Sequence, residues 1–420
     1  MLSKEQILER NKLIGENGAK TRMKRAKQIC KTFRFKIDYG NLNLHQKEHI
    51  KMMFVEAKWI YNYLLSQDNI CSFNYKDLKQ VIHKDKNRKD IVSDIQYIKS
   101  SVKQELIAQI VNQIKGLSKL KKKGHKTGKL RFKSEFNSIK LKQYGVTHSL
   151  RGNKFKIQGI NKLIRVRGLE QLSKYENIDY TTANLLYDGI NYYVALTCFI
   201  DKEDKQYKND IVGIDMGVST TLTLSDGTKY DISVGESDRL KKLQAKLVSK
   251  QKGSNNRHKL IKKIRKEHIR VNNKKNDISN KIVHSILTTN KKIVIQDEQL
   301  NEWRQDGMSG SKIQHSILGR VKTKLMQSDR TVVLDKWFPT TKYCSKCGSK
   351  VELELKDRTF ECPNCKTKED RDIHAANNMI WFYLHTINAP GTDVNMLVDN
   401  KVSYKKFVAK QESTTSLLKI

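Results

Sequence analysis

Apolar residues in the first third of the chain recur at helical spacing in two places. The first repeat begins near Asn43 and would lie on one face of a helix; its members are Ile50, Met53, Phe54, Ala57, Tyr61, Leu64 and Leu65. The second predicts a helix over about 101–118, with Leu106, Ile110, Ile114 and Leu117 in register. Both faces are expected to pack in a core. Residues 1–31 are polar and basic, which favours a helix or an arm that orders on binding, and TFRFKIDY after them predicts a strand.

From about 138 to 205 the pattern is that of strands. Aromatic and β-branched residues dominate in KFKIQGI, LIRVRG, TANLLY and YYVALTCFI. Asp188 and Gly189, between the last two, are a hairpin-turn signal because glycine accepts a positive φ. The early strand, the two helices and this segment predict a small β-barrel with helices inserted into it. The polar stretch at 201–210 is the expected boundary of this lobe.

Acidic residues follow apolar strands at separate places in the second lobe. In DIVGIDMGVSTTLTLSDG an apolar strand ends at Asp215, and the alternating TLTLSDG is expected to pair beside it. In KKIVIQDEQL a short apolar strand is followed by Gln296, Asp297 and Glu298. The third acidic segment contains Asp370 and Asp372. A carboxylate at the end of a buried strand is costly unless it is paired or binds a cation.

Three separated carboxylates on a basic chain are what a two-metal phosphodiester site requires. Such a site holds two ions about 3.5–4 Å apart, one activating water and the other stabilising the leaving oxygen. Carboxylate and water ligands suit the hard ion Mg²⁺. The alternative, solvated acids at strand ends, fits any one segment better than it fits all three.

The charge balance points to a polyanionic partner. Lys and Arg number 82 against 44 Asp and Glu, a net charge of +38. The usual polyanions are nucleic acids and anionic membranes, and no apolar run approaches the roughly 20 residues that a membrane span needs. Nucleic acid is therefore expected. The basic segment 119–133 is typical of a solvated linker or of a phosphate-contacting loop, and we favour the loop; its candidate contacts are Lys121, Lys122, Lys123, Lys126 and Arg131.

Four of the seven cysteines form two CxxC pairs, which are Cys344 with Cys347 and Cys362 with Cys365. Four thiolates complete a closed tetrahedral site, so the expected metal is a structural zinc rather than a catalytic one. The other cysteines are scattered, as in a reduced cytoplasmic protein. Lys342, Tyr343 and Lys346 lie beside the first pair and are expected to touch the nucleic acid.

The order of GIDMGVSTTLTLSDG, IVIQDEQL, WFPTTKYCSKCG and CPNCKTKEDRDIHAANNM resembles the RuvC-like nuclease domain of the TnpB family. These are transposon-encoded RNA-guided endonucleases related to type V CRISPR nucleases. FRFKIDYGNLNLHQKEHIKMMFVEAKWIYNYLL and GKLRFKSEFNSIKLKQ are similar to the wedge and recognition segments of that family. The resemblance covers roughly residues 32–385.

The resemblance implies a multidomain fold of α/β and α+β type. A basic N-terminal arm precedes a wedge-like β-barrel with an inserted helical recognition segment, and an RNase H-like (RuvC) domain with an inserted zinc ribbon follows. The expected ranges are arm 1–31, wedge 32–43 and 119–205, recognition insertion 44–118, nuclease domain 206–335 and 369–385, ribbon 336–368 and flexible tail 386–420.

In that family an acidic residue at the exit of the ribbon completes the metal site. By position this role is assigned to Asp370 ahead of Asp372, and His374, where the family usually has Asn, is expected to open the last helix without a catalytic role. Many relatives have Glu where this chain has Gln296. Since side chains alternate along a strand, Glu298 would face the same side about 6.6 Å further on and is assigned as the second ligand ahead of Asp297. Gln296 is then an outer hydrogen-bonding group.

Between the first two acidic segments lie basic stretches that predict a helical hairpin. Ser237 or Asp238 can cap its first helix. The resemblance implies that this basic face lines a channel for a guide RNA and DNA heteroduplex. Gly307 and Gly310 further on are expected hinges of a lid over the site.

The resulting hypothesis is an RNA-guided endonuclease whose partners are a guide RNA and double-stranded and single-stranded DNA. Its N-terminal lobe would read a short DNA motif, and Mg²⁺-dependent cleavage would use Asp215, Glu298 and Asp370. Two alternatives stay open. One is a guided DNA-binding repressor that no longer cuts, and the other is a type V effector with a CRISPR-array-derived guide.

Overall fold

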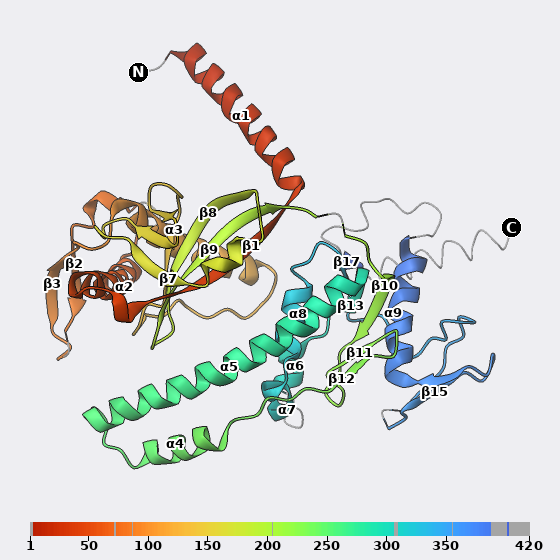
Figure 1. Ribbon diagram of the computed structural model, residues 1–420. Helices are drawn as coiled ribbons and strands as arrows, with labels where there is room; N and C mark the ends of the chain where they lie inside the picture. Colours follow the sequence, from red (N-terminus) through yellow and green to blue (C-terminus); the bar gives the residue numbers. More distant parts are fainter. Residues whose placement is uncertain are drawn as a thin grey trace. The chain divides into compact units, whose positions relative to one another are not determined.

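The chain folds into two compact units, Met1–Asp204 and Lys205–Ile420, and the division falls in the polar stretch where the sequence predicts a boundary (Figure 1). Each unit has its own sheet and its own core. The structure is a computed structural model that describes residues 3–70, 73–85, 87–203, 205–305, 310–354, 356–387 and 401–402.

The first unit is built on a seven-stranded antiparallel sheet in the order β4-β8-β9-β1-β7-β6-β5. The strands are β1 (Gln28–Ile37), β4 (Ser138–Leu141), β5 (His148–Arg151), β6 (Lys154–Ile157), β7 (Ile164–Arg167), β8 (Ile178–Tyr187) and β9 (Tyr192–Asp201). The predicted hairpin joins β8 to β9, with Gly189 at φ 91°. The predicted barrel is thus a nearly closed sheet that keeps two edge strands, β4 and β5.

The two predicted helices of this unit are present as α2 (Leu44–Leu65) and α3 (Ser100–Lys122). Asn43 caps α2 in a reciprocal pair of bonds with Gln46, as the local sequence favours. The apolar face of α2 is buried, but in α3 the stripe leaves the core after Ile110, and Ile114 is 38% exposed. The prediction that Ile114 packs in the core is therefore wrong.

Three further elements differ from the predicted outline of the first unit. The arm contains a long helix, α1 (Lys4–Ala26), and β1 starts at Gln28 rather than at Thr32. A two-stranded hairpin, β2 (Gln80–Lys84) with β3 (Asp90–Asp94), stands between the helices and was not predicted. The first part of the predicted basic loop, Lys119–Lys122, is the last turn of α3.

The second unit has a six-stranded sheet in the order β12-β11-β10-β13-β14-β17. Its strands are β10 (Asn209–Asp215), β11 (Leu222–Leu224), β12 (Lys229–Tyr230), β13 (Asn290–Gln296), β14 (Thr331–Leu334) and β17 (Lys401–Val402). The predicted pairing of β11 beside β10 is confirmed as antiparallel, whereas β10, β13, β14 and β17 run parallel. The carboxyl ends of β10, β13 and β14 therefore meet at one edge.

The last strand corrects the expectation of a flexible tail over 386–420. Lys401 and Val402 pair with Val333 and Leu334, so these two residues belong to the sheet. The helix before the tail, α9 (Arg371–Ile387), also runs past residue 385. The rest of the predicted tail lies outside the described residues.

Helices cover the two faces of this sheet. One face carries α5 (Asn255–Thr289) and α8 (Leu318–Leu325), with α6 (Leu300–Gln305) and α7 (Gly310–His315) nearby, and α4 (Asp238–Val248) packs against α5. The predicted basic hairpin is α4 followed by α5, and Ser237 is the cap of α4. Gly310 begins α7, and Gly307 lies outside the described residues.

The other face of the sheet is covered by α9, which lies along β10 (Figure 1). Between β14 and α9 the chain makes the predicted ribbon with its hairpin, β15 (Thr359–Glu361) and β16 (Lys368–Asp370). The contact of α9 with β10 is unusually close at Gly213. A Cβ atom there would lie 1.9 Å from the carbonyl oxygen of Ala376.

Because a Cβ atom cannot fit at that distance, Gly213→Ala must push α9 away from β10. We expect a loss of about 1–3 kcal/mol in the free energy of unfolding, measured with urea. Gly235→Ala is the matched control, since nothing lies within 4 Å of its added Cβ. Equal stability of the two variants would contradict the close contact.

Candidate functional site

Asp215 stands at the carboxyl end of β10 on the side that faces α9. Val212 and Ile214 point into the core on the α5 and α8 side, while Gly213 meets α9. Since side chains alternate along a strand, Asp215 follows Gly213 onto the α9 side. Asp372 lies in the first turn of α9. The fold thus brings these two carboxylates, 157 positions apart in the chain, to one edge of the sheet.

The electrostatics of Asp215 identify its neighbours. Burial, followed by the charges of Asp372 and Glu298, raises the pKa of Asp215 to about 7. Burial also raises the pKa of Glu298, although Lys322 opposes the shift. Like charges close together disfavour ionisation, so the other two carboxylates oppose the ionisation of Asp215. Glu298 and Asp372, from the other two acidic segments, therefore lie near enough to Asp215 for their charges to raise its pKa.

These carboxylates do not close around a single ion. In the described ranges, the cysteines form the only set of three or more potential ligands whose atoms all lie within 4.8 Å of one another. Ligands of two ions about 3.5–4 Å apart are spread more widely than those of one ion. The open arrangement is thus compatible with a two-ion site and not with a compact single-ion cage.

Asp370, the residue assigned from position, has other partners. Its Oδ1 accepts the backbone N–H groups of Asp372 and Ile373, at 3.0 and 3.2 Å, which caps α9. Its Oδ2 accepts a 2.8 Å bond from Lys229 of β12. Burial works against ionisation, but Lys229 and the helix N–H groups outweigh it and hold the pKa of Asp370 below its usual value. The structure gives Asp370 a capping role.

Gln296, expected to be an outer hydrogen-bonding group, makes its hydrogen bonds with a neighbouring loop. It is 4% exposed, and its Nε2 donates to the carbonyl oxygens of Asp335, Lys336 and Phe338 at 3.2, 3.1 and 2.8 Å. Thr340 donates to its Oε1. The amide therefore holds the loop that follows β14.

The backbone beyond Gln296 does not continue the extended strand that was expected to carry Glu298. β13 ends at Gln296, and the N–H of Glu298 donates to the carbonyl of Gln296, so the chain turns at this point. Glu298 reaches Asp215 through that turn and not by continued alternation. The carboxylate of Asp297 accepts a 2.8 Å hydrogen bond from Lys322 of α8.

Lys322 was not foreseen from the sequence. Its ammonium group, 12% exposed, donates both to Asp297 and to the backbone carbonyl of Glu298, at 2.8 and 2.6 Å. It therefore fixes the turn that carries Glu298. The residue belongs to an ordinary amphipathic helix, and no spacing signal separates it from the chain's other lysines.

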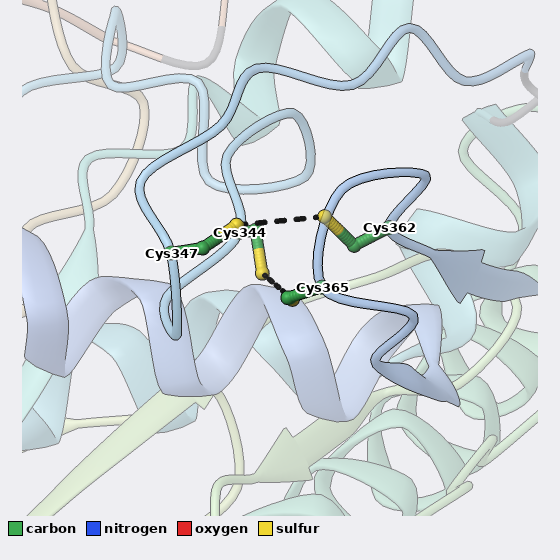
Figure 2. Close-up of side chains that lie close together, drawn as sticks. All are labelled: Cys344, Cys347, Cys362 and Cys365. Atoms are coloured by element: carbon green, nitrogen blue, oxygen red, sulfur yellow. Dashed lines mark hydrogen bonds between the residues drawn. The ribbon is translucent and has the colours of Figure 1, made fainter.

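The four predicted cysteines converge from two loops, as Figure 2 shows. Cys344 and Cys365 have their sulfurs 3.5 Å apart, and Cys347 and Cys362 have theirs 3.6 Å apart. Sulfurs at the corners of a tetrahedron centred 2.3 Å away would be about 3.8 Å apart, the spacing around thiolate-bound zinc. These four residues can therefore hold one metal ion.

The two cysteine loops are built alike. In each, the carbonyl of the first cysteine accepts the N–H four residues on, from Gly348 and from Lys366. Both of these residues have positive φ, 72° and 57°. Hydrogen bonds with Ser349 lower the pKa of Cys347 to about 6, which favours the thiolate that binds metals.

The cysteine loops are joined to α9 through His374. Its ring stacks on Phe360 with centroids 3.5 Å apart, its Nδ1 lies 2.5 Å from Glu369 Oε1, and its Nε2 lies 2.6 Å from the carbonyl of Tyr343. Asn378 donates to the same carbonyl. α9 begins at Arg371, so His374 does not open the helix, but it does contact its neighbours as expected. The ribbon thus holds the helix turn that carries Asp372.

The predicted nucleic-acid contacts lie in different places. Five of them are exposed at the end of α3 and in the loop after it, in the first unit, and these are Lys121, Lys122, Lys123, Lys126 and Arg131. Lys342 is in the ribbon and is paired with Glu352 at 2.8 Å. No helix in the described residues has an apolar stretch of the length that a bilayer crossing needs.

Two domain families match this chain. Residues 196–303 match OrfB_IS605, described as "Probable transposase", and residues 316–379 match the Cas12f1-like TNB domain. The first match contains Asp215 and Glu298, and the second contains the cysteines and Asp372. Together the two matches support an assignment to the TnpB family.

Curated relatives agree with this assignment. A Streptomyces pristinaespiralis protein named as an RNA-guided DNA endonuclease is 29% identical over 215 residues, which cover 49% of this chain and 53% of the relative. Another from Escherichia coli K12, named as the RNA-guided DNA endonuclease InsQ, is 25% identical over 197 residues, 40% of this chain and 48% of the relative. The matched region spans about half the length of each relative.

Solved structures show a looser similarity. A Cas12f1-sgRNA-target DNA complex has a chain with 14% identity and a TM-score of 0.44, covering 84% of this chain and 99% of that one. The mini-RNA-guided endonuclease CRISPR-Cas_phi3 has 9% identity and a TM-score of 0.39, covering 84% and 92%. At these scores the chains superpose only loosely.

The raised pKa of Asp215 predicts that Asp215→Asn stabilises the metal-free protein. Folding raises this pKa from 3.8 to about 7, so the folded state loses stability as the pH rises through that interval. We expect a gain on the order of 2–4 kcal/mol above pH 7 that disappears below about pH 4, measured by urea unfolding in chelator. Asp231→Asn, at an exposed position, is the control. A gain that does not depend on pH would contradict this electrostatic origin.

Proposed function

We propose that this protein is an RNA-guided DNA endonuclease that cuts by Mg²⁺-dependent phosphodiester hydrolysis. The observation that carries the proposal is the gathering of Asp215, Glu298 and Asp372 at the edge where the parallel strands end. Two relatives named as RNA-guided DNA endonucleases support the reaction class. The domain division set out from the sequence remains part of this proposal, with the six-stranded sheet as the RuvC-like nuclease domain.

The proposed ligands of the two ions are Asp215, Glu298 and Asp372. Bound Mg²⁺ would supply an activated water and charge stabilisation for the leaving oxygen. Asp372 replaces Asp370 in this role because Asp370 is used by Lys229 and the helix cap. Lys322 would hold Asp297 and the Glu298 turn in place, as the hydrogen bonds support. Asp215 would lose its proton when the ions bind.

The metal of the cysteine site is proposed to be a structural zinc. Four thiolates leave no open position for a substrate or water. Its role would be to fold the ribbon that holds the first turn of α9 through His374 and Asn378. In this way a closed metal site would influence a catalytic carboxylate that it does not touch.

The proposed partners are a guide RNA and a DNA target that is opened from double to single strands. The net charge of +38 supports a polyanionic ligand, and the first unit is proposed to read the short adjacent DNA motif. A repressor that no longer cuts is less favoured because all three acidic segments still place a carboxylate at the edge. An array-derived guide would be recognised from the RNA that co-purifies.

The carboxylate assignment is tested by Asp372→Asn and Asp370→Asn, assayed with guide RNA, matched DNA and Mg²⁺. Asp372→Asn is expected to lose cleavage by at least about 100-fold while target binding persists, because it removes a metal ligand. Asp370→Asn should keep most of the activity, since asparagine can still cap α9. Glu298→Ala should behave like Asp372→Asn. The reverse order for the two aspartates would restore Asp370 as the ligand.

The zinc assignment predicts one zinc per chain by elemental analysis of the folded protein. Cys362→Ser should lose the metal, unfold the ribbon locally and abolish cleavage, because α9 loses its support. Cys30→Ser, which removes an exposed cysteine outside the cluster, should retain zinc. Folded, active protein that contains no zinc would refute the assignment.

The guided mechanism predicts that site-specific cutting needs the RNA. RNA-free protein should bind DNA loosely, with affinity that falls steeply as salt is raised, since the attraction is mainly electrostatic. Adding the co-purifying RNA should produce cuts only in DNA that pairs with it. Equally specific cleavage by RNA-free protein would contradict guidance.

A further inference from the structure

The loop after β14, residues 335–340, is fixed from beneath by buried amides. Gln296 donates to three of its carbonyl groups, those of Asp335, Lys336 and Phe338. Asn378 of α9 donates to a fourth, that of Thr340, at 2.6 Å. Buried hydrogen bonds of this kind hold a loop in one conformation. The segment is therefore a rigid loop.

This rigid loop presents a tryptophan to solvent. Phe338 is 2% exposed and anchors the loop in the core, whereas Trp337, its neighbour, is 63% exposed. Lys336 places its ammonium group 4.9 Å from the centroid of the Trp337 ring. A large aromatic side chain left in water forgoes the free energy of burial that its neighbour gains. An exposed indole on a fixed backbone can stack against a planar ligand.

The loop starts at the same edge as the carboxylates. Ile214 of β10 is in register with Ile295 of β13, and Gln296 with Leu334 of β14. Neighbouring strands lie about 4.8 Å apart, so the end of β14 is about 10 Å from the end of β10. Trp337 follows three residues after Leu334. A nucleic-acid strand bound at Asp215 would pass close to this loop.

We propose that Trp337 stacks on a base of the single-stranded DNA segment that is held at the carboxylate edge, and that Lys336 contacts its backbone. This inference rests on the proposed nuclease function. Every base has a π-face, so an exposed aromatic ring can hold single strands of any sequence, as a guided enzyme requires. Trp337 is then a substrate-binding residue, and Gln296 is the residue that positions its loop.

The same geometry explains the amide at position 296. Its N–H₂ group donates to three carbonyl oxygens, which a carboxylate would instead repel. Gln296→Glu is therefore expected to release the loop and weaken strand binding, although it adds an acidic group beside the site. Gln296→Glu and Trp337→Ala should act through the same contact, so the double variant should lose no more binding than Trp337→Ala alone.

Stacking is tested directly by the tryptophan fluorescence of the purified full-length protein, titrated with an oligothymidylate of twelve nucleotides. Binding should quench the wild type more than Trp337→Phe at equal occupancy, with occupancy measured by anisotropy of a labelled oligonucleotide. Trp303→Phe, which removes a partly buried tryptophan in α6, should quench like the wild type. Equal quenching of Trp337→Phe and the wild type would overturn the proposal.

Cleavage supplies the second readout. With guide RNA and matched DNA, Trp337→Ala should raise the DNA concentration needed for half-maximal rate about fivefold or more, whereas Trp337→Phe should remain near the wild type. Unchanged zinc content and unfolding midpoint would show that the fold is intact. If the protein cuts nothing but Trp337 is quenched, the proposed function fails and the stacking site stands. If the protein cuts and Trp337→Ala cuts as well as the wild type, the stacking proposal alone fails.

Discussion

The close approach of α9 to β10 at Gly213 is the constraint on which the arrangement of the second unit depends. With no side chain at this position, the carbonyl of Ala376 can lie against the strand. The first turn of the helix then stands beside the end of β10, and Asp372 lies near Asp215. A methyl group at Gly213 would remove this contact, and the carboxylates would lose their common edge.

That contact places groups together that repel one another. The pKa of Asp215 rises to about 7 because the protein buries it near two other carboxylates. Such an arrangement persists only where the surroundings hold it, and here those surroundings are the core under the sheet, the Lys322 bonds to the Glu298 turn and the ribbon against α9. In the proposed function, divalent cations bound by these carboxylates would offset the repulsion between them.

The ribbon and the loop after β14 share this supporting function. His374 and Asn378 on α9 both reach the carbonyl of Tyr343 at the start of the ribbon, and Asn378 also reaches Thr340 in the loop. Gln296 fixes the same loop from β13. One network of hydrogen bonds therefore links the ribbon, the last helix and the strand that precedes Glu298.

The sequence alone determined those features that depend on neighbours along the chain. Helical spacing predicted α2, the CxxC pairs predicted the cysteine cluster, and the apolar strand before Asp215 predicted β10, since each signal is a local pattern. Tertiary structure decided the rest. Asp370 and Asp372 are two residues apart and chemically identical, and only the position of Lys229 and the start of α9 separate a helix cap from a member of the carboxylate cluster. The role of Gln296 was likewise hidden, because its partners are about 40 positions away and are backbone carbonyls, which every residue possesses.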